Sequence, residues 1–279
     1  MFTDYDITNF FTYKGTFREM GFTGQDYDGG GRTLFLITSI VLLLILWIVF
    51  RKAQKKHVLT FIRIFAITLT SLYIIKTTWE SICDITIGDG NFNEGILPLD
   101  TCSIPMLAGF LAGWGKGKVK EAAEGWLVAG NIIGGISNLL FLRALNYYPY
   151  FTFGAMYSMF WHFIMVFLGV WMIITNYVEL NFKLVLGGFA LHMAFSLIVI
   201  PYDYIRDWDF MLYKEAGGAP LIEGISDKLW EAGVGWITTP IMIATYFGLF
   251  SAIIYASKGI KALVHLIPSK KTKEEEIPA

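Results

Sequence analysis

The sequence predicts an all-α protein, a polytopic bundle of about seven membrane-spanning helices, and three observations lead to this fold class. Of the 279 residues, 55% are hydrophobic and only 16% are charged, whereas a soluble domain has about 25% charged residues. Apolar runs recur at about the 20-residue length that a helix needs to cross a bilayer core of about 30 Å. Basic residues gather in alternate connections between these runs, as they do in multi-pass proteins.

Seven apolar runs approach the length of a span. They are 33–50, 58–79, 96–113, 125–142, 151–175, 182–200 and 236–257. The predicted organisation is an extracellular N-terminal segment 1–32, a seven-helix transmembrane domain 33–257 and a cytoplasmic tail 258–279. The tail contains the run "KKTKEEE", which is typical of a solvated end.

The basic residues of the connections predict the orientation in the membrane. Most of them fall on one side, namely Arg51, Lys52, Lys55, Lys56, Lys116, Lys118, Lys120, Lys183, Lys258, Lys261, Lys270, Lys271 and Lys273. This side is expected to be cytoplasmic, which puts the N-terminus outside and the C-terminus inside the cell membrane. The longest connection, 201–235, then lies outside and is expected to cap that face. The net charge of −1 gives no reason to expect a nucleic-acid partner.

The N-terminal segment combines acidic residues, aromatic residues and three successive glycines that join it to the first span. The glycines indicate a flexible connection. The aromatic residues, which include Phe10, Phe11, Tyr13 and Phe17, indicate that the segment lies on the membrane surface.

The third apolar run, "ILPLDTCSIPMLAGFLAG", carries four consecutive polar or reactive residues: Asp100, Thr101, Cys102 and Ser103. An acidic residue at the centre of a span costs about 2.5–3.5 kcal/mol, so its presence is a functional-site hypothesis by default. Within a helix, Pro105 would leave the carbonyl of Thr101 without its donor, beside Cys102.

Counting along the spans at about 1.5 Å per residue places several polar residues in the outer half of the bundle. Cys102, His162 and Asn138 fall at a similar depth, and His192 lies nearer the middle. A thiol reacts as a thiolate, and a histidine within reach can take its proton, which is the logic of acyl transfer by a Cys-His pair. Asn138 or a backbone donor near Pro105 would stabilise an oxyanion. The alternative is structural, since a lone Cys often packs as a small hydrophobe and a lone His often bonds a neighbouring helix.

Two interpretations of Asp100 remain open. It could orient His162, but residues two apart on a helix point about 200° apart, so Asp100 and Cys102 share a site only if the prolines distort the backbone. It could instead pair with Lys76, because charges within membranes usually pair. The histidines lack the close spacing of a zinc site, and the sequence predicts neither a metal nor a cofactor.

Three motifs carry a resemblance to a known family: "EGILPLDTCSI", "SMFWHFIMV" and "PYDYIR" followed by "GGAPLIEGISDKL". In this order they resemble the YwaF-type family of bacterial integral membrane proteins over roughly residues 33–257. That family is similar to the animal acyltransferases of ether phospholipids and, more distantly, to the androgen-induced membrane hydrolases of fatty esters. The resemblance implies a nucleophile at Cys102, a histidine partner at His162 and a membrane lipid or acyl-lipid as substrate. Asp100 stands where the family pattern usually has histidine.

The predicted function is therefore membrane-embedded lipid acyl transfer or acyl-ester hydrolysis, with Cys102 and His162 as catalytic residues and substrate entering from the outer leaflet. The predicted supporting residues are Asp100, Ser103, Asn138, His192 and Lys76. The alternative is a non-enzymatic membrane protein. It would be either a transporter with a midplane site at His192, Asp100 and Asn131, or a structural subunit whose outer loop binds partners.

Overall fold

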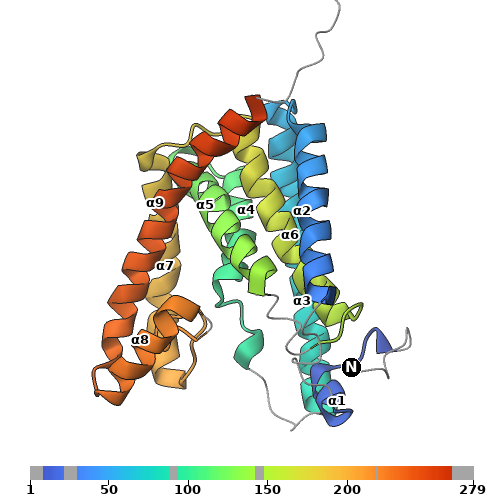
Figure 1. Ribbon diagram of the computed structural model, residues 1–279, viewed down its shortest axis with the longest axis vertical. Helices are drawn as coiled ribbons and strands as arrows, with labels where there is room; N and C mark the ends of the chain where they lie inside the picture. The colour runs from blue at the N-terminus through green and yellow to red at the C-terminus, as the bar shows by residue number, and fades with distance from the viewer. Residues whose placement is uncertain (1–8, 22–29, 88–93, 142–147, 218, 266–279) are drawn as a thin grey trace, which may run out of the picture.

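The computed structural model describes residues 9–21, 30–87, 94–141, 148–217 and 219–265, and within these ranges the chain is helical and contains no strand (Figure 1). The long helices are α2 (Gly30–Phe50), α3 (Lys55–Thr86), α5 (Gly117–Phe141), α6 (Phe153–Ile174), α7 (Phe182–Arg206) and α9 (Thr238–His265). The short ones are α1 (Lys14–Glu19), α4 (Ile104–Trp114) and α8 (Pro220–Glu231).

Among the described helices, α2, α3, α6, α7 and α9 are long and apolar enough to cross a membrane. The prediction of a helical membrane bundle is confirmed to that extent. Two predicted spans fall short. Helix α4 has 11 residues, or roughly 16 Å at the rise of an α-helix. Helix α5 has 25 residues, but its first turns carry Lys118, Lys120, Glu121 and Glu124.

The third predicted span, 96–113, is not one helix. Two 3-10 turns, η3 (Glu94–Ile96) and η4 (Thr101–Ser103), precede α4. Pro105 lies in the first turn of α4, where its missing N–H costs no helical hydrogen bond. The carbonyl of Thr101 accepts a hydrogen bond from the backbone N–H of Ile104. The expectation that Pro105 leaves this carbonyl unpaired is therefore wrong.

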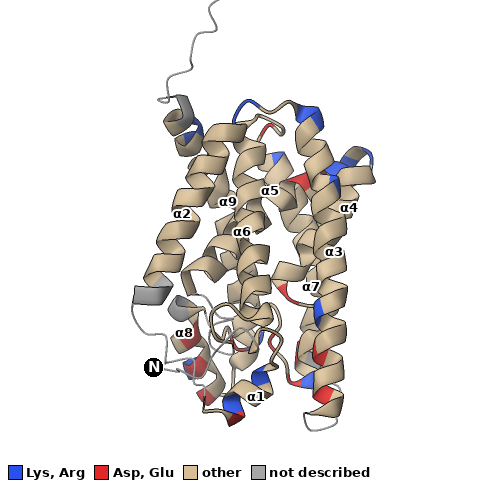
Figure 2. Ribbon diagram, turned by 90° about the vertical axis from the view of Figure 1, so that its right-hand side faces the viewer, with Lys and Arg blue, Asp and Glu red and all other residues tan. Residues whose placement is uncertain are grey.

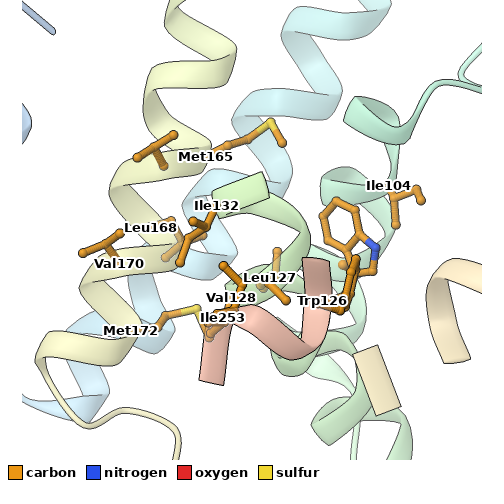
Figure 3. Packing of buried hydrophobic residues seen from close by; sticks show 14 of the residues in the cluster. Ile104, Trp126, Leu127, Val128, Ile132, Met165, Leu168, Val170, Met172 and Ile253 are labelled. Atoms are coloured by element: carbon orange, nitrogen blue, oxygen red, sulfur yellow. The ribbon is translucent and has the colours of Figure 1, made fainter. Parts of the chain in front are cut away.

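Helix α5 is central and packs against α4, α6 and α7. Figure 3 shows its side chains Leu127, Val128 and Ile132 facing residues of α6 such as Leu168. On the α7 side, a Cβ at Gly125 would lie 2.1 Å from a backbone carbonyl oxygen of α7. Close approach of this kind matters in lipid, because apolar burial alone does not hold helices together there.

The charged residues divide between the two ends of the bundle (Figure 2). Lys and Arg gather at the end that holds the connections 51–54 and 115–116, which we call the basic end. Most Asp and Glu lie at the opposite end, which holds residues 9–21 and 207–235 and which we call the acidic end.

Residues 9–21 pack into the acidic end rather than lying as a whole on its surface. Phe17 is fully buried and contacts Tyr148. The hydroxyl of Tyr13 donates to Asp84 of α3. Phe11, by contrast, is 63% exposed. The predicted surface position of the aromatic residues therefore fails for Phe17 and Tyr13, which are held by α3 and α6.

The connection predicted at 201–235 is shorter, because Pro201 lies within α7. Segment 207–219 turns back into the bundle, and both carboxylate oxygens of Asp209 hold the turn. They accept from the backbone N–H groups of Lys214 at 2.9 Å and Gly217 at 3.0 Å. The side chain of Tyr213 is fully buried. Part of this connection thus penetrates the bundle instead of only covering it.

Candidate functional site

A cavity of about 250 Å³ lies between η4, α5, α6, segment 207–219, α8 and α9. Its polar lining comprises Asp100, Thr101, Cys102, Ser137, Asn138, His162, Thr245 and Tyr246. Its apolar lining comprises Ile133, Gly134, Phe141, Phe210, Leu212, Ala219, Ile222, Met242 and Leu249. The volume is just below the roughly 300–1,000 Å³ of ordinary ligand pockets, so it accommodates one part of a lipid rather than a whole lipid.

The break before α4 brings three consecutive residues to this cavity. Asp100, Thr101 and Cys102 all line it, because the chain there forms a 3-10 turn and not an α-helix. The angle of about 200° that separates residues two apart on an α-helix therefore does not apply to Asp100 and Cys102. On α6, His162 lies roughly 13 Å along the helix from its first residue, Phe153.

Two aromatic residues hold the backbone of this segment. The indole N–H of Trp161 donates to the carbonyl of Cys102 at 2.9 Å. The hydroxyl of Tyr73 on α3 donates to the carbonyl of Ile96. The rings of Tyr73 and Trp161 are in contact, with centroids 6.2 Å apart. The position of Cys102 is therefore set by side chains of α3 and α6 together.

The hydrogen bonds of His162 define its tautomer. Its Nδ1 lies 2.7 Å from the backbone carbonyl oxygen of Ser158, which can only accept. Nδ1 therefore carries the proton, and the neutral ring has Nε2 as its acceptor. The side chain is buried and lines the cavity.

Four predicted site residues thus line one cavity: Asp100, Cys102, Asn138 and His162. No hydrogen-bonded pair of Cys102 and His162 occurs in the described part of the chain. The two side chains share a cavity without forming the contact of an assembled catalytic pair. The cavity offers apolar side chains that can contact a hydrocarbon chain, and a thiol, an imidazole and an amide line the same cavity.

Lys76 and Ser103 do not belong to this lining. The ammonium of Lys76 pairs with Glu80 at 2.6 Å, one turn along α3. Residues four apart on a helix are neighbours, so Glu80 is the carboxylate that Lys76 meets on its own helix, and the interpretation that pairs Lys76 with Asp100 gains no support from this contact. Ser103 is buried at the end of η4.

His192 belongs to a separate buried network. Its Nε2 lies 3.0 Å from the hydroxyl of Tyr213, which lies 2.7 Å from the hydroxyl of Ser196. His192 is not among the residues described as lining the cavity, because segment 207–219 supplies it with a different partner, Tyr213. Tyr246 connects the two regions: its ring contacts His192, and its hydroxyl lies 3.4 Å from that of Thr101.

The wall formed by α9 and segment 207–219 is missing from the sequence-based prediction. Thr245 and Tyr246 are adjacent polar residues in the middle of the seventh predicted span, and this signal could have identified them. Phe210 and Leu212 give no such signal, because their position depends on how Asp209 folds the segment.

Within the described residues, no group of three His, Cys, Asp or Glu side chains could hold a metal ion. Cys83 and Cys102 form no disulfide. No protein-family model, no curated protein and no solved structure matches the chain. Fold and site together define a class: a helical bundle with apolar helices of membrane-crossing length and a mostly apolar cavity that is lined in part by polar side chains.

Proposed function

We propose that the chain crosses the cell membrane seven times, with the N-terminus outside and the C-terminus inside. Segment 96–114 would make the third crossing and α5 the fourth. The long helices and α4 run in alternating directions along the bundle, and the basic residues gather at one end (Figures 1 and 2). The basic end would be cytoplasmic by the positive-inside rule. The cavity would then lie toward the outer side, because segment 207–219 and α8 of the acidic end contribute to its lining.

The activity we propose is acyl transfer from a membrane lipid, or hydrolysis of an acyl ester, with Cys102 as nucleophile and His162 as general base. The observation that carries this proposal is that both side chains line one cavity whose other walls are largely apolar. Such a cavity suits the reacting end of an acyl chain, while the remainder of the lipid stays in the bilayer.

In the first step, Nε2 of His162 accepts the thiol proton of Cys102 and the sulfur attacks the ester carbonyl carbon. The C–S bond forms, the ester C–O bond breaks, and the proton passes from His162 to the leaving oxygen. In the second step an alcohol or water attacks the thioester, its proton goes to Nε2, and the thiol is regenerated as the C–S bond breaks. The amide of Asn138 would donate to the oxyanion of both tetrahedral intermediates.

This sequence of steps requires Cys102 and His162 to come within hydrogen-bond reach when substrate is bound. Catalytic hydrogen bonds are often loose without substrate and tighten in the complex. The bond of Nδ1 to Ser158 supports the role of His162, because it directs the free lone pair of the ring to Nε2.

The test is to trap the thioester on the full-length protein in lipid nanodiscs with an alkyne-tagged acyl ester. We expect a label that neutral hydroxylamine removes, that is lost in Cys102→Ala and that forms at least 100-fold more slowly in His162→Gln, within the roughly 10²–10⁴-fold range of general base catalysis. Cys83→Ala is the matched control and should label normally. Equal labelling of Cys102→Ala and Cys83→Ala would overturn the proposal.

A second candidate function is solute transport, favoured by Asn131 on α5. Asn131 is fully buried, and neither atom of its amide has a partner among the described residues. Unsatisfied polar groups at membrane depth often mark a solute path. Transport would appear as substrate-dependent flux into proteoliposomes that survives Cys102→Ala and falls in Asp100→Asn, whereas an acyltransferase would lose its activity in Cys102→Ala.

A further inference from the structure

Arg63 places a cation on the lipid-facing side of α3. It lies eight residues from the first residue of α3, or roughly 12 Å along a helix that is long and apolar enough to cross a membrane. Its side chain is exposed, and so are those of Ile64 and Ile67 on the same helix. In lipid, a charge at such a position is costly unless an opposite charge accompanies it or it reaches the headgroups.

Helix α4 fixes the orientation of this guanidinium. The Nε–H group of Arg63 donates to the carbonyl of Gly113 at 2.8 Å, one of the last carbonyls of α4, which lack a helical donor. Gly113 permits the close approach, because a Cβ at this position would lie 3.0 Å from Cγ of Arg63. The guanidinium also lies over the ring of Trp114, 5.5 Å from its centroid. Two contacts with the end of α4 thus orient the group.

These contacts leave most of the donors of Arg63 unused within the described part of the chain. A guanidinium has five N–H groups, and Nε–H alone has an acceptor among the described residues. No described carboxylate forms an ion pair with Arg63. Lys120 of α5 also reaches the end of α4, at the carbonyl of Ala112, but it pairs with Glu124 at 3.1 Å. The N–H groups of Nη1 and Nη2 can therefore receive an acceptor from outside the protein.

The surroundings of Arg63 match those of a phospholipid headgroup. Tryptophan is enriched at the level of the headgroups, and Trp114 is the exposed last residue of α4. One turn deeper on that helix, exposed Phe110 stacks on Trp114 with ring centroids 5.5 Å apart. Beyond Trp114 follow the exposed residues Lys116 and Lys118 of the basic end. A phosphate at Arg63 would have apolar side chains on its membrane side and further cations on the other.

We propose that Arg63 and Trp114 bind the phosphate of an anionic phospholipid in the leaflet at the basic end, with its acyl chains along Ile67 and Phe110. The planar fork of Nη1 and Nη2 matches two phosphate oxygens, which arginine binds through paired charge-assisted hydrogen bonds. The exposed lysines of the basic end favour a headgroup with net negative charge. These four residues are not among those that line the cavity, so the site does not depend on the proposed function.

The test measures lipid binding to the full-length protein in a neutral maltoside detergent by native mass spectrometry. The probes are dioleoyl phosphatidylglycerol, dioleoyl phosphatidylcholine and dioleoylglycerol, which share their acyl chains. We expect phosphatidylglycerol to bind with a Kd about tenfold below that of phosphatidylcholine, and dioleoylglycerol to bind most weakly. Equal Kd values for the two phospholipids would overturn the proposal. Displacement of phosphatidylglycerol by millimolar inorganic phosphate would show a site for free phosphate and not for a lipid.

Three variants assign the effect to one guanidinium. Arg63→Gln should raise the Kd of phosphatidylglycerol about tenfold and leave that of dioleoylglycerol unchanged. Arg63→Lys keeps the charge without the fork and should raise the Kd roughly threefold or more. Lys183→Gln removes an exposed charge of the basic end at the start of α7, and as the matched control it should bind like the native chain. Native affinity in either Arg63 variant, or an equal loss in Lys183→Gln, would overturn the proposal.

A cross-linking measurement on the native chain decides if the Arg63 variants do not yield folded protein. Phosphatidylglycerol with a diazirine near the carboxyl group of one acyl chain should cross-link, on irradiation, to residues 59–67 of α3 and 107–114 of α4. Cross-links confined to other helices would contradict the proposed site. Acyl trapping at Cys102 is a separate readout, so either proposal can fail while the other stands.

Discussion

The hydrogen bond from Trp161 to the carbonyl of Cys102 permits a quantitative prediction about the site. Trp161→Phe keeps an aromatic ring in place but removes the donor of this 2.9 Å bond. Trp161 is 3% exposed, so little water reaches the carbonyl that loses its partner. A buried acceptor without a partner costs about 1–3 kcal/mol.

The loss falls on η4, which is a single 3-10 turn that contains Cys102 itself. If about 1.0–1.4 kcal/mol of this cost is relieved when η4 moves away from α6, the population of the displaced state rises roughly five- to tenfold. We expect the maleimide labelling rate of Cys102 to rise by the same factor. Cys83, which lies near the acidic end of α3, should label at an unchanged rate.

The chain contains a closely matched control on the same helix. The indole N–H of Trp171 donates to the carbonyl of Phe50 at 2.9 Å, and Trp171 is 4% exposed. Trp171→Phe should lower the melting temperature about as much as Trp161→Phe but leave the reactivity of Cys102 unchanged. If both variants accelerate labelling equally, the cause is global loosening of the fold, and the reasoning about η4 is refuted.

Three further predictions concern stability in detergent. Gly125→Ala should lower the melting temperature strongly, because its Cβ would lie 2.1 Å from a backbone oxygen, whereas Gly248→Ala, with open space around it, should have little effect. Tyr148→Phe should cost about 1–3 kcal/mol, because buried Glu80 loses a hydrogen bond of 3.0 Å; a melting temperature equal to that of the native chain would contradict this. Burial disfavours the charged form of Lys214, but its two carboxylate partners outweigh this and raise its pKa. Since the pKa is higher in the folded than in the unfolded state, the stabilisation is present below about pH 10 and is lost as the pH rises further; Lys214→Gln should remove this alkaline dependence of the melting curve.

The positions of the long helices follow from the sequence, but the site depends on features that hydropathy does not report. The run 96–113 has the composition of a membrane span, but its summed hydropathy cannot show at which residue the helix begins. If the helix began further toward the N-terminus, the carbonyl of Thr101 would face the nitrogen of Pro105. This nitrogen carries no proton, so the helical hydrogen bond could not form. Starting α4 beside Pro105 avoids this loss, and it leaves the four preceding polar residues outside the helix.

The contact of Lys76 with Glu80 illustrates the difference between local and distant partners. The sequence offers Lys76 two carboxylates, those of Glu80 and Asp100, and only Glu80 is one helical turn away. Glu80 lies four residues along α3 and reaches Lys76 whatever the tertiary fold, whereas Asp100 depends on the packing of another segment. A partner one turn away on the same helix can therefore be predicted from the sequence, whereas a partner on another segment cannot.

Segment 207–219 shows where sequence-based reasoning lacks the necessary information. Its polar and aromatic composition is typical of a surface loop, yet Tyr213 is fully buried and reaches His192. The cause is a set of side-chain to backbone hydrogen bonds centred on Asp209, which turns the segment inward. Such bonds depend on local geometry that residue types alone leave undetermined.

The register of α6 explains how Cys102 and His162 come to share a cavity. Trp161 and His162 are consecutive, so their side chains point about 100° apart around the helix. One of them holds the carbonyl of Cys102, and the other lines the cavity that the Cys102 side chain also lines. A rotation of α6 by one residue would break the bond to Cys102 and turn His162 away from the cavity at the same time. The positions of both Cys102 and His162 therefore depend on the rotation of α6 about its axis. Helix α6 thus contributes to the site through Trp161 as well as through His162.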